Sequence, residues 1–169
     1  GADYIYFRDA TLGVPDEAYI AALAQTPGDV RHAGLALGMG GLPHLIDYVD
    51  PVWRFNRDPA PDKVATSWRL SLRACLTRAV VVEKLGGPDP HFETLAAASL
   101  EMGHRWIQAG ALMRHIAELV TPGAQATERP SLPLDDEMRF LRLRYGRMWT
   151  AWACWRNWRR GGGLADTVR

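Results

Sequence analysis

The spacing of hydrophobic and polar residues predicts a chain in which strands and helices alternate. Short runs rich in β-branched and aromatic residues are typical of buried strands, whereas longer runs with acids near the start are typical of helices. Strands are predicted over residues 4–7, from 30 into a glycine-rich turn at 41, over 68–75 and over 112–120. Helices are predicted over residues 14–24, 79–85 (alternatively the end of a strand), 95–109 and 135–160. This order predicts an α/β fold with a mixed sheet flanked by helices, followed by a long C-terminal helix.

Proline and glycine residues divide the chain into regions. Four prolines make residues 42–66 a loop-rich excursion, and three more make residues 121–134 a linker. We therefore expect one domain over residues 1–120, then the linker and an amphipathic helix over 135–160. Residues 161–169 begin with three glycines and are expected to form a flexible tail.

Composition narrows the classes of function. The 169 residues are 47% hydrophobic and 23% charged, as in ordinary globular domains, and the formal net charge is +1. That charge does not favour a nucleic-acid partner. The two cysteines lie far apart and form neither a metal cluster nor a disulfide scaffold, which fits a reducing compartment and so a cytoplasmic protein. No apolar run approaches the roughly 18 residues that span a bilayer.

Two neighbouring segments carry the most specific pattern. Residues 86–92 read Gly-Gly-Pro-Asp-Pro-His-Phe, and the predicted helix that follows carries Glu101 and Arg105. This order resembles the acceptor-side motif of family 2 glycosyltransferases, which have the GT-A fold and transfer a sugar from a nucleotide with inversion. The resemblance runs from Tyr4 to about Trp152 and implies a partial GT-A domain with a Rossmann-like mixed sheet. The family's nucleotide-binding first half has no counterpart here, so we expect a further portion before Gly1.

The resemblance implies a divalent cation, Mg²⁺ or Mn²⁺, near the end of the first predicted strand. In the family an Asp-x-Asp motif follows that strand. Here Asp9-Ala10-Thr11 fills the slot, with Thr11 in place of the second acid. Hard cations prefer oxygen ligands and would neutralise the departing diphosphate. Aligning from Pro15 instead would shift the slot by one residue, and the alternative is that Asp9 only caps a turn.

The resemblance also assigns the catalytic base to the helix predicted over 95–109. Ala98 and Ser99 stand where the family has an acid pair, and the Ser99 hydroxyl cannot act as a base at neutral pH. Glu101 is therefore the better candidate for removing the proton of the acceptor hydroxyl. Because Glu101 and Arg105 are spaced i, i+4 and share a helix face, the alternative is an exposed salt bridge.

Five residues are predicted to bind substrate. They are Trp68, Arg73, Asp89, His91 and Arg105. Trp68 and Arg73 belong to the segment that resembles the family strand facing the acceptor, where an indole can stack on a sugar ring. The alternative for Trp68 is a place in the core. His91 lies in the loop before the helix of the base and is the histidine best suited to touch substrate.

The predicted C-terminal helix is rich in tryptophan and arginine. Trp149, Trp152, Trp155 and Trp158 recur every three residues among several arginines, over a broad face. This mixture suits a membrane interface or an acidic partner, whereas the alternative is packing against the core. A peripheral membrane contact is in keeping with the family, many of whose members use lipid-linked or cell-surface acceptors.

The activity implied is transfer of a hexose from a nucleotide diphosphate sugar to a hydroxyl of a glycan or lipid-linked acceptor, with inversion. The alternative is a catalytically silent module that binds a glycan or a partner at a membrane surface. Residues without a carboxylate at positions 11, 98 and 99 favour that alternative. The surroundings of Glu101 separate the two: a cleft beside Asp9 favours the enzyme, and a surface pair with Arg105 favours the silent module.

Overall fold

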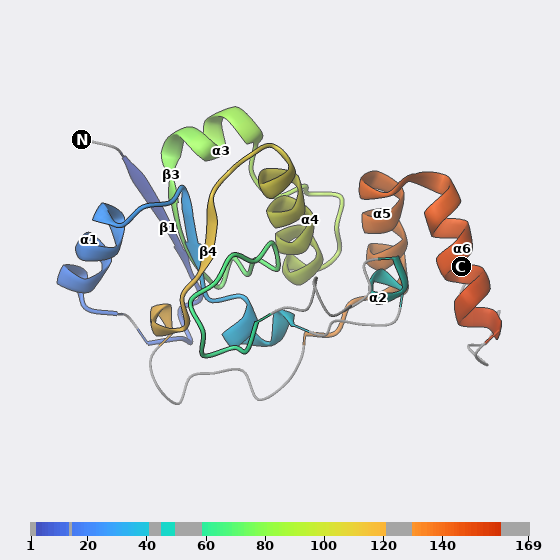
Figure 1. Ribbon diagram of the computed structural model, residues 1–169, viewed down its shortest axis with the longest axis horizontal. Helices are drawn as coiled ribbons and strands as arrows, with labels where there is room; N and C mark the ends of the chain where they lie inside the picture. The colour runs from blue at the N-terminus through green and yellow to red at the C-terminus, as the bar shows by residue number, and fades with distance from the viewer. Residues whose placement is uncertain (1–2, 14, 41–44, 50–58, 121–129, 160–169) are drawn as a thin grey trace.

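A mixed four-stranded sheet forms one half of the molecule (Figure 1). The computed structural model describes residues 3–13, 15–40, 45–49, 59–120 and 130–159. The strands are β1 (Tyr4–Arg8), β2 (Val30–His32), β3 (Ala74–Arg78) and β4 (Met113–His115), in the order β1–β3–β2–β4. Strand β3 is antiparallel to β1 and β2, whereas β2 and β4 are parallel. The predicted α/β class with a mixed sheet and flanking helices is therefore confirmed.

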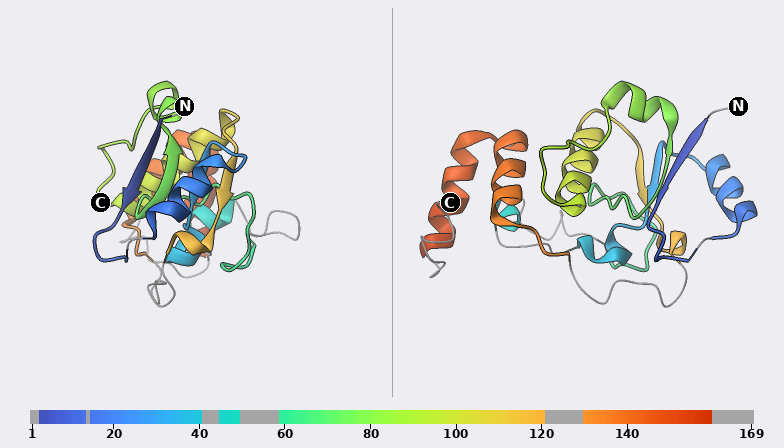
Figure 2. Two further views of the ribbon diagram at one scale, coloured as in Figure 1. Left: turned by 90° about the vertical axis from the view of Figure 1, so that its left-hand side faces the viewer. Right: turned by 180° about the vertical axis from the view of Figure 1, so that it is seen from behind.

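The helices cover both faces of the sheet and extend beyond it. They are α1 (Glu17–Gln25), the helical turn η1 (Leu35–Met39), α2 (Ile46–Val49), α3 (Ala79–Leu85), α4 (Leu95–Gln108), the turn η2 (Ala117–Leu119), α5 (Leu134–Arg144) and α6 (Gly146–Arg159). Figures 1 and 2 show α1 and α4 on opposite sides of the sheet, with α5 and then α6 farther out beyond α4. None of the described helices is long and apolar enough to cross a membrane.

Neighbouring residues of β3 pack into different hydrophobic clusters because side chains alternate along a strand. Ala74 and Leu76 pack on the side of α1, together with Leu23. Cys75, between them, packs on the side of α4 together with Trp106. The sheet is therefore buried on both faces, and its position relative to α4 is fixed by the core.

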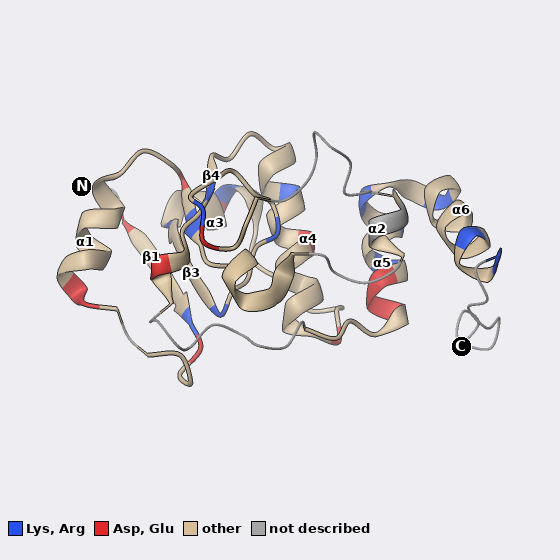
Figure 3. Cartoon of the chain, turned by 60° about the horizontal axis from the view of Figure 1, so that its bottom comes forward, with Lys and Arg blue, Asp and Glu red and all other residues tan. Residues whose placement is uncertain are grey.

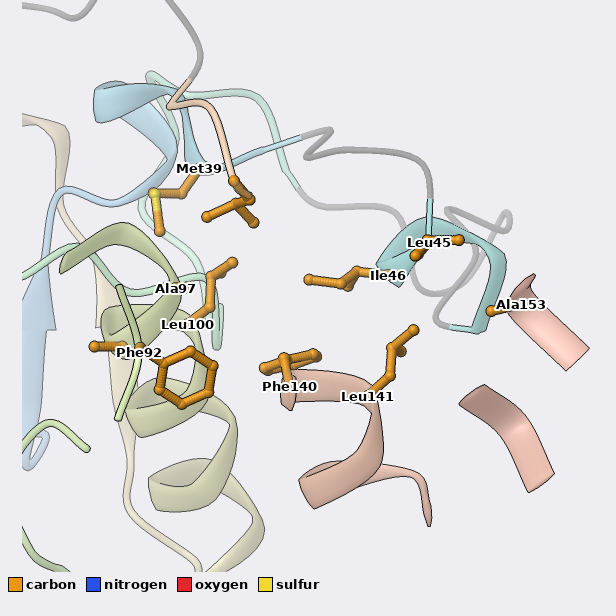
Figure 4. Packing of buried hydrophobic residues seen from close by; sticks show 11 residues of the cluster. Met39, Leu45, Ile46, Phe92, Ala97, Leu100, Phe140, Leu141 and Ala153 are labelled. Atoms are coloured by element: carbon orange, nitrogen blue, oxygen red, sulfur yellow. The ribbon is translucent and has the colours of Figure 1, made fainter. Parts of the chain in front are cut away.

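A third cluster attaches the C-terminal helices to α4 (Figure 4). Leu100 of α4 faces Phe140 and Leu141 of α5, and these side chains are fully buried. Ile46 of α2 and Ala153 of α6 complete the cluster. The layers of the molecule thus follow one another as sheet, α4, α5 and α6.

Capping residues explain where the correctly predicted helices begin and end. Asp16 precedes α1, and its carboxylate accepts a hydrogen bond from the amide of Ala18 at 3.2 Å. Thr94 caps α4 in the same way through the amide of Ala97, and Gly110, with a φ of +91°, follows the end of that helix. Residues 79–85, predicted as either a helix or the end of a strand, form the helix α3.

The strand predicted over residues 68–75 is wrong except at its end, because β3 begins only at Ala74. Serine hydroxyls bind the backbone amides that a strand would present to its neighbour. The amide of Arg69 donates to Ser67 Oγ at 3.2 Å. The amide of Arg73 donates to Ser71 Oγ at 3.3 Å. Residues 67–73 therefore form an irregular segment instead of a strand.

Two other elements are shorter or divided relative to the prediction. The strand over 112–120 is confined to β4, since its partner β2 spans only three residues, and η2 follows it. The C-terminal region is helical as predicted, and it is divided between α5 and α6 at Gly146, whose φ is +82°. Residues 121–129 of the predicted linker, the predicted tail, and residues 42–44 and 50–58 of the predicted loop-rich region lie outside the described residues.

Candidate functional site

Asp9 follows β1 directly and is held by Thr11 and Arg73. Its Oδ1 accepts hydrogen bonds from the Thr11 amide at 2.8 Å and from the Thr11 hydroxyl at 2.7 Å. Its Oδ2 accepts from Arg73 Nε, also at 2.8 Å. The hydrogen bonds from Thr11, followed by the one from Arg73, lower the pKa of Asp9 to about 2. Asp9 is therefore ionised at neutral pH and is already paired with a cation.

The side chains of Arg73 and Ser99 line a small pocket close to Asp9. The pocket has a volume of about 90 Å³, and its other lining residues are Leu37, Met39, Ser71, Leu95, Ala96 and Pro130. Ser99 is buried, with its hydroxyl donating to the Leu95 carbonyl at 2.6 Å and accepting from the Leu72 amide at 3.2 Å. The structure thus brings together Asp9, Arg73 and Ser99, three predicted site residues from distant parts of the chain.

The described residues at Asp9 and Thr11 do not fit a divalent cation. Both carboxylate oxygens of Asp9 already accept hydrogen bonds, and the Thr11 hydroxyl is turned toward Asp9 as a donor. A cation would have to displace the guanidinium of Arg73 and then find further oxygen ligands. Within the described ranges, no three His, Cys, Asp or Glu side chains are grouped as a metal site.

Glu101 faces away from that pocket. It lies two residues beyond Ser99 on α4, so the two side chains point about 200° apart around the helix. The Glu101 side chain is only 3% exposed, and Arg105 donates to both of its oxygens, from Nε at 3.1 Å to Oε1 and from Nη2 at 3.2 Å to Oε2. Arg144 of α5 forms an ion pair with Oε1, with Nη2 at 3.1 Å. Glu101 is therefore a buried acid between two arginines, neither in the cleft of Asp9 nor on the surface.

Arg105 also fixes the turn that contains Gly86 and Gly87. Its guanidinium donates to the carbonyl oxygens of Leu85, Gly86 and Gly87, the last at 2.7 Å. The indole N–H of Trp106 donates to the Gly86 carbonyl at 3.0 Å. The motif that carries the family resemblance is thus held together by α4, and Arg105 is engaged with protein groups.

Trp68 belongs to an aromatic cluster between the irregular segment and helices α4 and α5. Its ring stacks on Phe140 at a centroid distance of 5.8 Å and meets the edge of His104 at 5.2 Å. The guanidinium of Arg69 lies 5.0 Å from the centre of the ring. Both faces of the indole therefore have protein neighbours, which fits the core alternative for Trp68.

Asp89 and His91 form a local pair in the loop before α4. Asp89 Oδ1 accepts from the His91 amide at 2.9 Å and contacts the imidazole Nδ1 at 2.7 Å, and the first of these hydrogen bonds is the main cause of a lowered pKa of Asp89. His91 lines a pocket of about 470 Å³ between this loop and α5, with Glu93, Asp135, Asp136, Met138, Arg139, Arg142 and Leu143. This pocket shares no lining residue with the pocket at Arg73 and Ser99.

Two buried groups that hold the site together were missed by the sequence reasoning. Asp136 of α5 accepts from the amides of Glu93 and Thr94, at 2.8 and 2.9 Å, and so fixes the start of α4. Arg144 pairs with Glu101. The only sequence signal was the cluster of acids and arginines at the two ends of the helix predicted over 135–160, which fits the helix dipole equally well.

His32 of β2 is a further buried group that the sequence did not single out. Its Nδ1 accepts from the amide of Gly34 at 3.1 Å, so the proton lies on Nε2, which donates to the carbonyl of Ser67 at 2.9 Å. Burial lowers the pKa of His32 to about 3. The neutral ring ties β2 to the irregular segment that carries Arg73.

Comparisons with protein-family models, with curated proteins and with solved structures found no match to this chain.

Proposed function

We propose that this chain is the acceptor-side part of a glycosyltransferase-like domain of family 2, and that its cleft binds a sugar substrate without supplying a catalytic base. The observation that carries the proposal is that Arg73 and Ser99 line one pocket while Arg73 also pairs with Asp9. The family resemblance led to the expectation of a site built from these three parts of the chain. The mixed sheet is in keeping with the same resemblance.

The chemistry of the cleft suits a sugar or a diphosphate. Arg73 donates to Asp9 through Nε, which leaves its two terminal amino groups for a phosphate or for sugar hydroxyls. The Arg73 side chain is 37% exposed and therefore accessible to a ligand. The ionised carboxylate of Asp9 can accept hydrogen bonds from hydroxyl groups at the same place.

The absence of a free base among the described cleft residues favours binding over catalysis. Deprotonation of the acceptor hydroxyl requires a group whose pKa is matched to the task. Ser99 is neutral, the pKa of Asp9 is about 2, and Glu101 is buried between two arginines outside the pocket. None of the three meets that requirement.

The second candidate is an active inverting transferase, which the partial exposure of the ionised Asp9 beside Arg73 favours. In that reaction the acceptor oxygen forms a bond to the anomeric carbon while the bond from that carbon to the diphosphate oxygen breaks. Asp9 would accept the proton of the acceptor hydroxyl, and the nucleoside diphosphate would leave with the electron pair. The acceptor would be a hydroxyl of a glycan or of a lipid-linked sugar.

The test is calorimetric titration of the full chain with UDP, UDP-sugars and GDP-sugars. Arg73→Gln is expected to weaken binding about tenfold or more, because it removes a charge-assisted contact. Arg78→Gln is the matched control, since Arg78 forms a similar ion pair with Asp29 at the other end of β3 and is 41% exposed. Binding is expected to be independent of Mn²⁺. Equal effects of the two variants would contradict the proposal. No binding of any of these compounds would exclude nucleotides and nucleotide sugars as ligands of the cleft.

Release of nucleoside diphosphate separates the two candidates. The silent module binds nucleotide sugar and does not release diphosphate when glycan acceptors are added. Steady turnover that is lost in Asp9→Asn, with binding retained, would instead establish the active transferase.

A further inference from the structure

Helix α6 has an apolar side that no described part of the chain covers. Met148 is 82% exposed, and Trp155 is 48% exposed. Met148, Trp152 and Trp155 are spaced i, i+4 and i+7, so they lie on one side of the helix. Buried Thr150 and Ala153 lie on the other side, toward the protein.

Positive charge accompanies the exposed rings. Helix α6 carries Arg147, Arg156 and Arg159 and has no acidic residue among its fourteen residues, all of which are described (Figure 3). The guanidinium of Arg156 lies 5.1 Å from the ring centre of Trp152, and that of Arg159 lies 5.1 Å from Trp155. Each of these two guanidiniums therefore lies against an indole ring.

The helix stands at the outer end of the molecule. Figures 1 and 2 show α6 beyond α5, on the side away from the sheet. Arg142 and Leu143, in the last turn of α5, are exposed as well. A broad flat partner can therefore reach the exposed side of α6 without meeting the rest of the described fold.

We propose that α6 is an interfacial helix that seats the protein on a bilayer containing anionic phospholipids. The indoles and Met148 enter the boundary between headgroups and acyl chains, while the stacked guanidiniums reach the phosphates. The charge of the helix selects an anionic surface. A bilayer is favoured over an acidic protein because α6 exposes large apolar side chains together with arginines. The proposal is independent of the sugar cleft, to which α6 contributes no lining residue.

The test is flotation of the full chain with vesicles of phosphatidylcholine, with and without phosphatidylglycerol. We expect binding to the mixed vesicles and much weaker binding to phosphatidylcholine alone. The double variant Met148→Ser, Trp155→Ser is expected to weaken binding to the mixed vesicles about tenfold or more. Its control is Leu112→Ser, because Leu112 is 47% exposed and precedes β4 in the sheet half.

Substitution of the arginines is a second test in the same vesicle assay, independent of the apolar substitutions. Arg156→Gln and Arg159→Gln are each expected to reduce binding to the mixed vesicles about fivefold and to leave the weak binding to phosphatidylcholine unchanged. Arg8→Gln, at the exposed last residue of β1, is the charge control. Absence of vesicle binding, or equal loss in variants and controls, would overturn the proposal. Binding to soluble heparin that survives the double apolar variant, without vesicle binding, would assign the surface to an acidic macromolecule instead.

Discussion

Glu101 is the residue whose surroundings most affect the interpretation of this chain. Its carboxylate is withdrawn from solvent, accepts hydrogen bonds from Arg105 and forms an ion pair with Arg144, and the two arginines lie on different helices. The desolvation of a buried charge is offset only while its partners remain in place. The carboxylate thus connects α4 to α5, and its role is structural in this arrangement.

Replacement of Glu101 by glutamine is expected to lower the free energy of unfolding by about 2–4 kcal/mol, because two arginines lose their counter-ion. Urea denaturation measures this loss. Glu83→Gln, at an exposed position of α3, is the control and should change stability by less than about 0.5 kcal/mol. A Glu101→Gln protein of unchanged stability that had lost transferase activity would show that Glu101 is the base after all.

The sequence was a better guide to which residues are important than to which side chains they pair with. The sequence singled out Asp9 and Glu101 by their place after a strand and on a helix. It did not predict their partners Arg73 and Arg144, since those pairs depend on how distant segments pack. An i, i+4 spacing indicated the pair of Glu101 with Arg105, but the burial of that pair depends on the docking of α5.

At the scale of elements, the irregular segment 67–73 lies in a space that two glycines keep open. A Cβ atom on Gly103 of α4 would lie 2.2 Å from the carbonyl oxygen of Trp68. A Cβ atom on Gly34 would lie 1.8 Å from the carbonyl oxygen of Arg69. The backbone of this segment therefore passes between α4 and the start of η1 at a separation that only glycine permits.

The variant Gly103→Ala is expected to destabilise the fold by about 3 kcal/mol or more, although alanine favours helices, because the backbone of residue 68 must move. Thermal unfolding followed by circular dichroism measures the effect. Gly87→Ala is the control, since a Cβ atom there would have no neighbour within 4 Å. A Gly103→Ala protein as stable as the control would mean that the segment relaxes without cost.

Elements with local signals were predicted well, and elements set by distant contacts were not. Helix α4 has a threonine cap and a terminal glycine in its own sequence, and its bounds agree with the prediction to within one residue. The apolar alternation after Trp68 looked like a strand. Instead, backbone amides of this segment donate hydrogen bonds to Ser67, Ser71 and Ser99. Ser99 lies on α4, so a pattern within the segment could not reveal this contact.

At the scale of the whole molecule, the buried His32 couples stability to pH. The folded state holds this ring neutral down to about pH 3, whereas in the unfolded chain its pKa is about 6.5. Between these values the unfolded state binds one proton more than the folded state. Stability therefore falls as the pH is lowered through this window, by up to about 1.4 kcal/mol per pH unit. His104 is also buried, and burial lowers its pKa, so it acts in the same direction.

Urea unfolding between about pH 7 and pH 4.5 measures this dependence, above the range in which Asp9 titrates. The variant His32→Gln retains a hydrogen-bond donor and an acceptor. Its free energy of unfolding is expected to depend less steeply on pH, by the equivalent of up to one proton. An unaltered slope in the His32 variant would assign the pH dependence to other groups.

The tryptophans that the structure describes differ widely in their exposure to solvent. Trp106 is fully buried between the sheet and α4, whereas Trp149, Trp155 and Trp158 are about half exposed on α6. The fluorescence of the intact protein thus combines emission from an apolar interior with emission from a solvated, positively charged helix. An anionic quencher such as iodide is attracted to that helix and should remove the red part of the emission spectrum more efficiently than caesium does. Intrinsic fluorescence can therefore follow α6 separately from the core without an added label.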